Sequence, residues 1–271
     1  GRGGSGHGGC TSGRQRGSSD AARVATAKIS ALRRERRWAE ALSVFAEATR
    51  AKLETDVILY SAVISAVERG QEWERALSLW QEMRASLIEP DLFTFSSAMA
   101  AARTGAKWEK ALDMLREMYV EAVRPNDFIY NILVSACEKA GQWELAFAVL
   151  EVMEAVTIEP DEVSFNSALT ACATGEQWEQ AMKLLWQMEH RGRSPTIMGF
   201  GAAVNACSKA GCWEQAFHLL LLMRARQVAP NAITYNAAIT AAERGHVWEP
   251  ALVLLRDMER ESVRADAVTY S

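Results

Sequence analysis

Residues 127–161 read DFIYNILVSACEKAGQWELAFAVLEVMEAVTIEPD, and this stretch decides the fold. Apolar residues recur in its first half at the i, i+3, i+4, i+7 spacing of one helix face, at Tyr130, Leu133, Val134 and Cys137. The same spacing returns in its second half, at Trp143, Ala146, Phe147, Leu150 and Met153. The pair at 140–141, Ala-Gly, separates the two patterns, and an extended turn at 158–161 ends the stretch. We therefore expect two short helices joined by a tight turn.

The same pattern runs through most of the chain with a period of 35 residues. Seven of the nine tryptophans keep this spacing without insertion or deletion, at Trp38, Trp73, Trp108, Trp143, Trp178, Trp213 and Trp248. Five of the six prolines mark the end of successive units, at Pro90, Pro125, Pro160, Pro195 and Pro230. The units are 22–56, 57–91, 92–126, 127–161, 162–196, 197–231 and 232–266, followed by a partial unit at 267–271. Because one helix pair cannot bury its apolar face alone, the repeats predict a stacked array.

The expected fold class is therefore all-α, a right-handed α-solenoid of antiparallel helix-turn-helix repeats over residues 22–271, with the hand taken by analogy. Residues 1–21 differ from the array, because eight of the chain's 17 glycines lie in the first 17 residues. We expect a disordered Gly/Ser/Arg-rich tail there, either a nucleic-acid contact or a linker or remnant of a targeting peptide. The chain begins without Met and breaks off inside an eighth unit, so we expect both ends to be cuts through a longer protein.

The composition is typical of a folded chain rather than a disordered or membrane-spanning one. Apolar residues make up 49% of the sequence and charged residues 24%. No run approaches the roughly 20 consecutive apolar residues that span a bilayer. Five cysteines are too few, and odd in number, for a secreted disulfide scaffold. We expect no membrane partner.

The repeat resembles the pentatricopeptide repeat family. The resemblance rests on Tyr130-Asn131 near the start of the unit, EKAG at 138–141 in the turn, WELA at 143–146 after it, Met153, and Pro160-Asp161 at the end. It covers residues 22–271. The tetratricopeptide repeat is the near competitor, but its period is about 34 residues and it does not end its units on Pro-Asp in this way.

The resemblance implies sequence-specific binding of single-stranded RNA, one base per repeat, with the N-terminal repeat at the 5′ side. It places the base-reading residues at the fifth and last positions of each unit: Thr26 with Asp56, Ser61 with Asp91, Ser96 with Asn126, Asn131 with Asp161, Asn166 with Thr196, Gly201 with Asn231, and Asn236 with Asp266. The family's pattern reads a hydroxyl with Asp as G, a hydroxyl with Asn as A, and Asn with Asp as U. The hypothetical site is 5′-GGAUYNU-3′, in which the fifth pair is assigned only to a pyrimidine and Gly201 offers no side chain.

Two further sets of residues each keep one position in the repeat. By resemblance, the second residue of each unit stacks between successive bases, at Ile58, Phe93, Phe128, Val163, Met198, Ile233 and Val268, while Arg23 departs from this pattern in the first unit. A basic ladder of one repeat phase is a candidate for phosphate contact, at Arg34, Arg69, Lys139, Lys209 and Arg244. The alternative interpretation of the ladder is a cation at a helix C-terminus, where it complements the helix dipole.

The charge balance argues against promiscuous nucleic-acid binding. The net charge is −4, whereas a non-specific binder is usually basic. One local basic cluster stands out, at Arg33, Arg34, Arg36 and Arg37. This cluster is either a capture site for phosphates at the 5′ side or a solvated turn.

Other chemistry is not indicated by the sequence. Three cysteines share one repeat phase, at Cys137, Cys172 and Cys207, and a spacing equal to the repeat indicates buried packing rather than metal binding. The repeated glutamates after the tryptophans, at Glu74, Glu109, Glu144, Glu179, Glu214 and Glu249, complement helix dipoles rather than form an acid/base pair. We therefore expect no catalytic residue, metal, cofactor or small-molecule substrate.

The predicted function is non-catalytic RNA binding in the processing, stability, editing or translation of an organellar transcript, with the chloroplast or mitochondrion implied by resemblance. A competing class is a protein-interaction scaffold whose groove accepts a peptide or helix. Polar residues at the two reading phases favour RNA, whereas the net acidity and the irregular Thr196 and Gly201 favour the scaffold. Some members of the family carry a C-terminal deaminase-like or nuclease domain, so an enzyme is a third possibility for a longer protein.

Overall fold

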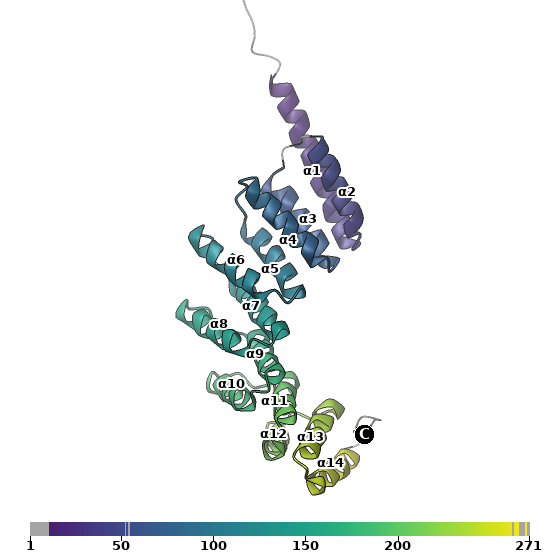
Figure 1. Ribbon diagram of the computed structural model, residues 1–271, viewed down its shortest axis with the longest axis vertical. Coiled ribbons are helices and arrows are strands. Elements are labelled where there is room, and N and C mark those ends of the chain that lie inside the picture. The colour runs from purple at the N-terminus through teal and green to yellow at the C-terminus, as the bar shows by residue number, and fades with distance from the viewer. Residues whose placement is uncertain (1–10, 52, 54, 262, 266–268, 270–271) are drawn as a thin grey trace, which may run out of the picture. The chain divides into compact units, whose positions relative to one another are not determined.

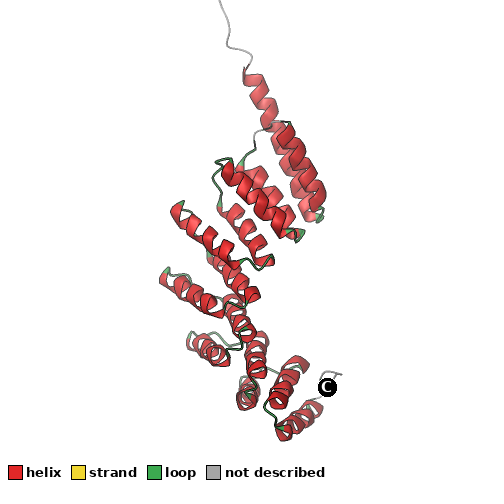
Figure 2. Cartoon of the chain, in the orientation of Figure 1, coloured by secondary structure: helices red, strands yellow, loops and turns green. Residues whose placement is uncertain are grey.

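The computed structural model describes residues 11–51, 53, 55–261, 263–265 and 269. Within this part of the chain it consists of fourteen α-helices joined by short loops, so the expected all-α class is confirmed (Figures 1 and 2). The chain divides into two compact units, Gly1–Ile132 and Leu133–Ser271. Each unit is a stack of helical hairpins, which is the arrangement of an α-solenoid.

The first unit is built from α1 (Thr11–Arg34), α2 (Trp38–Arg50), α3 (Val57–Arg69), α4 (Trp73–Ala85), α5 (Leu92–Thr104) and α6 (Trp108–Val120), and α7 (Asp127–Ala140) crosses the division. The first helices of successive repeats lie side by side, α1 against α3 and α3 against α5 (Figure 1). Each second helix packs on the first helix of its own repeat, and α2 and α4 also pack on that of the next. The first helices therefore form a continuous layer in this unit.

The second unit repeats this arrangement with α8 (Trp143–Ala155), α9 (Glu162–Thr174), α10 (Trp178–His190), α11 (Ile197–Ala210), α12 (Trp213–Ala225), α13 (Ala232–Arg244) and α14 (Trp248–Arg260). Here α9, α11 and α13 make the continuous layer. Each second helix begins at the periodic tryptophan, which explains the constant phase of that residue. None of the described helices combines the length and apolar character needed to cross a membrane.

The first helix begins earlier than the sequence predicted. The expected disordered tail covered residues 1–21, but residues 11–21 belong to α1, and residues 1–10 lie outside the described part of the chain. Extending an existing helix needs no second nucleation step, and this added segment contains just two glycines, Gly13 and Gly17. Residues 11–21 thus form the start of α1, where the sequence led us to expect part of the tail.

Tryptophan packing explains four of the glycines that precede second helices, namely Gly70, Gly105, Gly175 and Gly245. A Cβ atom on Gly70 would lie 2.3 Å from Cδ1 of Trp38, and one on Gly105 would lie 2.5 Å from Cδ2 of Trp73. The backbone at Gly70 is itself right-handed, with φ −77°, and the left-handed residue is the following one, Gln71, with φ 64°. At Gly211 the left-handed residue is the glycine itself, with φ 69°. The glycines between the two helices therefore occupy two different positions in the repeat.

The core is made of the periodic small and aromatic side chains. Methionines of one phase are fully buried in the second helices, at Met83, Met118, Met153, Met188, Met223 and Met258. Three cysteines, Cys137, Cys172 and Cys207, are also fully buried, which confirms their expected packing role. Burial raises the pKa of each of these three thiols to about 12.

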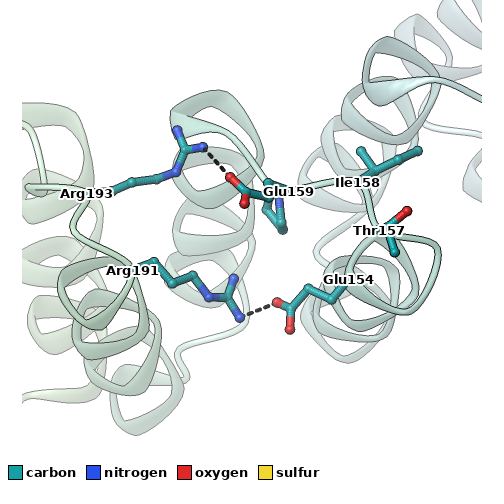
Figure 3. Close-up of a pocket in the computed structure, with 7 residues that line it drawn as sticks. Glu154, Thr157, Ile158, Glu159, Arg191 and Arg193 are labelled. Carbon is teal, nitrogen blue, oxygen red and sulfur yellow. Dashed lines mark hydrogen bonds and ion pairs between the residues drawn. The ribbon is translucent and has the colours of Figure 1, made fainter.

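Ion pairs join the ends of second helices in neighbouring repeats. In each pair, residue 28 of one unit meets residue 30 of the next, and the pairs are Arg84–Glu121, Glu154–Arg191, Glu189–Arg226 and Arg224–Glu261. Figure 3 shows Glu154 with Arg191, next to a second pair, Glu159–Arg193, with 3.7 Å between the charged atoms. The order of the charges is Arg to Glu in the first and last of these pairs and Glu to Arg in the two between them, so each contact matches its own neighbour.

Candidate nucleic-acid interface

In the described part of the chain, the last residue of a unit directly precedes the first helix of the next. Asp56 accepts a hydrogen bond from the Leu59 backbone N–H (2.8 Å), and Asn126 accepts one from Ile129 (3.1 Å). Other last residues cap their helices in the same way, at Asp91, Asp161 and Asn231. Aspartate and asparagine are favoured N-cap residues. Helix capping therefore accounts by itself for the polar character of this position, whereas the family resemblance pointed to base reading.

One described member of the last-position set departs from this pattern. Thr196 begins α11 but makes no side-chain capping bond. Its hydroxyl oxygen is buried without a hydrogen-bond partner in the described part of the chain. Asp266 lies outside the described residues.

The fifth residues lie in the first helices and are partly or fully buried. The hydroxyl groups of Thr26, Ser61 and Ser96 donate to the backbone oxygens of Ala22, Ile58 and Phe93, at 3.0, 2.9 and 2.8 Å. Each hydroxyl oxygen then keeps lone pairs that can accept a hydrogen bond. The amide residues Asn131, Asn166 and Asn236 hold the corresponding place in other repeats, and Gly201 leaves it open.

The second residues are exposed apolar side chains in each of the two units. Their exposed fractions are 58% at Ile58, 45% at Phe93, 57% at Phe128, 57% at Val163, 69% at Met198 and 75% at Ile233. Large apolar side chains of the core are nearly all below a tenth. Val268 lies outside the described residues, and Arg23 is exposed. Repeated exposure of apolar groups at one phase marks a surface that gains by contact with a ligand.

The structure brings the first pair of reading residues together with the first two stacking positions. Thr26 and Asp56 line one hollow of about 440 Å³, and Arg23 and Ile58 line it as well. The side chains come from α1 and from the start of α3, which are neighbours in the layer of first helices. An opening with polar atoms, flanked by an apolar group and a guanidinium, has the chemistry that a planar, hydrogen-bonding ring requires.

A third polar position was missed by the sequence reasoning. The hydroxyl of Thr94 donates to the carboxylate of Asp91, and the hydroxyl of Ser164 donates to Asp161 (2.9 Å). Both residues are third in their units, and serine or threonine also stands there at Thr234 and Thr269. The 35-residue period contained this signal, because a buried hydroxyl recurs at that phase.

The basic ladder has mixed surroundings. Arg34, Arg69, Lys139 and Arg244 are exposed, and Lys209 is half-buried. The guanidinium of Arg244 donates to the backbone oxygen of Lys209 (3.0 Å), near the C-terminal end of α11. This bond supports the helix-end interpretation for Arg244, while the exposed members remain accessible to an anion.

The basic cluster at residues 33–37 is partly neutralised. Arg37 bonds to Glu35 (3.0 Å) and Glu40 (2.7 Å), and its pKa is raised by these hydrogen bonds. Arg33 instead turns inward: one of its nitrogens lies 3.4 Å from the hydroxyl oxygen of Ser65, and its guanidinium carbon lies 5.8 Å from the centre of the Phe93 ring. Arg33 is thereby placed beside a stacking residue two repeats further on.

The described residues contain no group of three or more His, Cys, Asp or Glu side chains that could hold a metal ion. The periodic glutamates lie in the first turns of the second helices, for example Glu74 in α4 and Glu144 in α8, and both are exposed. This is the position in which an acid complements the helix dipole.

Comparisons with known proteins agree with the repeat. Family models described as "PPR repeat family", "Pentatricopeptide repeat domain" and "PPR repeat" match residues 125–174, residues 43–103 with 183–243, and residues 163–193, respectively. A comparison with curated proteins gives no significant match.

Solved structures of the same fold include several pentatricopeptide repeat proteins. The crystal structure of PPR10 from maize is 28% identical over 90% of this chain and 35% of PPR10, with a TM-score of 0.69. PPR10 in complex with an 18-nt psaJ RNA element is 19% identical over 92% of this chain and 41% of that one, with a TM-score of 0.57. The PPR domain of Arabidopsis thaliana protein-only RNase P 1 in complex with tRNA is 16% identical over 64% of this chain and 91% of that domain, with a TM-score of 0.55.

The chain spans about a third of the length of the maize protein. The family models, taken together, match residues 43–103 and 125–243, on either side of the division between the two units. The chain therefore belongs to the pentatricopeptide repeat family.

Proposed function

We propose that this protein binds single-stranded RNA through the layer of first helices, one base per repeat. The observation that carries the proposal is the exposure of apolar second residues, such as Phe93, Phe128 and Ile233. Exposing such groups to water is unfavourable unless a ligand covers them, and bases offer flat apolar faces. The similarity to PPR10, which has been crystallised with an RNA element, supports the same conclusion.

In this proposal, base identity is read by the fifth and last residues of each unit. Their hydroxyl, amide and carboxylate groups can pair with the edges of unstacked bases. The proposed site remains 5′-GGAUYNU-3′, where the first G is read by Thr26 and Asp56 in the hollow beside Arg23 and Ile58. Exposed members of the basic ladder, such as Arg69 and Lys139, contact the phosphates.

The proposed role is the binding of a specific organellar transcript for its processing, stability, editing or translation. The resemblance to the family supports a chloroplast or mitochondrial location. We propose that the chain itself carries no catalytic function.

The test is selection of RNA from a random pool by the full 271-residue chain at about 0.1 M salt. Enrichment of a GGAUY-like core is the expected result. A variant in which Ile58, Phe93 and Phe128 are all changed to alanine serves as the matched control, because these exposed side chains contribute little to the core. Enrichment of no sequence by the folded wild type would reject the proposal and favour the peptide-binding scaffold.

A further inference from the structure

The third residue of a unit lies beside the two reading residues of the unit before it. Thr94 and Ser164 donate hydroxyl hydrogen bonds to the last-position residues Asp91 and Asp161. Thr269 donates instead to the fifth-position residue, with 2.8 Å between its hydroxyl oxygen and Oδ1 of Asn236. The hydroxyl at this position therefore reaches either member of a reading pair.

Gly199, the third residue of its unit, has no side chain, whereas leucine and isoleucine stand at the same position in Leu59 and Ile129. A Cβ atom at residue 199 would lie 3.0 Å from Oδ1 of Asn166, so a side chain there would stand directly against the amide. In its absence, Oδ1 of Asn166 and Oγ1 of Thr196 are both buried without a hydrogen-bond partner in the described part of the chain. These two atoms belong to the fifth and last residues of the same repeat. The absence of a hydroxyl at residue 199 thus coincides with two reading residues whose side-chain oxygens lack a hydrogen-bond partner in the described part of the chain.

An amide whose oxygen is held by a hydroxyl presents its amino group to a ligand. Asn236, held by Thr269, is in this state. An amide that is not held can rotate and present either its oxygen or its amino group. Cytosine and uracil differ by an amino group in place of a carbonyl oxygen at one ring position. A rotatable amide can therefore pair with both bases. An amide whose oxygen is held presents its amino group and so favours uracil, which has the carbonyl oxygen.

We propose that Gly199 broadens the base preference of the fifth repeat to cytosine and uracil alike, and that a hydroxyl at residue 199 narrows it to uracil. Residue 199 is in this sense a positioning residue, because it acts through Asn166. The inference rests on the proposed RNA-binding function and adds a third residue to the reading of the fifth base.

The experiment compares Gly199→Thr and Gly199→Ser with Gly199→Ala. All three add a Cβ atom in the same tight place, 3.3 Å from Cδ1 of Leu169, but alanine lacks the hydroxyl and is the matched control. Dissociation constants are measured for RNAs of the proposed site that differ only at the fifth base. The wild type and the alanine variant are expected to bind cytosine and uracil RNAs within about twofold. The two hydroxyl variants are expected to favour uracil by about five- to tenfold, the effect of one net hydrogen bond.

Two internal controls separate the possible failures. The preference for guanine at the second base, read by Ser61 and Asp91, should not change in any variant. The melting temperature of the RNA-free protein should be higher for Gly199→Thr or Gly199→Ser than for Gly199→Ala, because a hydroxyl satisfies the buried Asn166 oxygen. A wild type that binds no RNA would overturn the proposed function together with this inference. Normal preference at the second base, with an unchanged cytosine-to-uracil ratio in both hydroxyl variants, would overturn the inference alone.

Discussion

The indole ring of Trp38 occupies the space that a side chain at residue 70 would need. A Cβ atom on Gly70 would lie 2.3 Å from Cδ1 and 2.5 Å from Cγ of this ring. The same relationship joins Trp143 with Gly175, and Trp213 with Gly245. The first residue of one second helix is thereby fixed against the turn of the next repeat, so tryptophan and glycine set the spacing of neighbouring hairpins.

Replacing Gly70 with alanine is expected to lower the free energy of unfolding by about 1–3 kcal/mol, the usual effect of overpacking a filled site. Urea unfolding followed by circular dichroism measures this change. In a Trp38→Ala background the same substitution should have little effect, because the clashing ring is gone. Equal losses in both backgrounds would show that the glycine is needed for another reason.

Replacing Phe93 with alanine is expected to weaken RNA binding by about tenfold, which corresponds to the loss of one aromatic stacking contact. The melting temperature should change little, because the ring is 45% exposed. Leu87→Ala is the matched control, since this apolar residue is 91% exposed but lies at a different repeat phase. Fluorescence anisotropy with a labelled RNA of the proposed site compares the three proteins. Similar affinities for all of them would remove Phe93 from the interface.

Replacing Asp91 with asparagine is expected to change the preferred second base from guanine to adenine. The fold should be preserved, because asparagine caps a helix about as well as aspartate and can still accept the hydrogen bond from the Thr94 backbone. Binding of RNAs that carry each of the four bases at the second position provides the measurement. The preference at the first base, assigned to Thr26 and Asp56, should stay with guanine.

Reversing one charge of the Glu189–Arg226 pair is expected to destabilise the second unit, and reversing both should restore its stability. The two side chains approach to 2.9 Å and join neighbouring second helices. The coupling should be on the order of 0.5 kcal/mol and should decrease at high salt, because Arg226 is half-exposed. A double-mutant cycle with Glu189→Arg and Arg226→Glu, followed by thermal unfolding at two salt concentrations, measures it. Additive effects of the two changes would mean that the pair contributes no coupling.

Thiol chemistry should distinguish Cys212 from the three periodic cysteines. Burial raises the pKa of Cys137, Cys172 and Cys207 to about 12, so these thiols stay protonated and covered in the folded state at pH 8. Iodoacetamide is expected to modify Cys212 before Cys137, Cys172 and Cys207, because the half-buried thiol of Cys212 is partly accessible. Mass spectrometry of peptides after limited reaction identifies the sites.

The same thiols make stability depend on pH at the alkaline end. Their pKa in the folded state lies above the ordinary value of 9, so the folded protein holds protons that the unfolded chain loses. The stabilising effect is complete below pH 9 and decreases as the pH rises towards 12. In a variant with alanine at all three positions this part of the alkaline decrease should disappear.

The sequence by itself determined the class of fold and the phase of every repeat. A spacing of 35 residues with two apolar stripes per unit permits little other than stacked helix pairs, because each hairpin must bury its apolar face against the next. The family resemblance then pointed to the second residues, and the structure shows that they are exposed from Ile58 to Ile233. The repeat spacing also identified the periodic cysteines as packing residues.

Contacts between repeats were decided by the tertiary structure. Glycine before the second helix was interpreted as a helix breaker, yet Gly70 is needed because Trp38 approaches it from the preceding repeat. The last-position residues were chosen as base readers, yet Asp56 and Asn231 also cap helices. The start of α1 at Thr11 and the unpaired amide of Asn166 beside Gly199 were likewise not evident in the sequence. The physical reason is that periodicity reports which face of a helix is buried, whereas hydrogen bonds and close packing depend on which atoms the neighbouring repeat brings near.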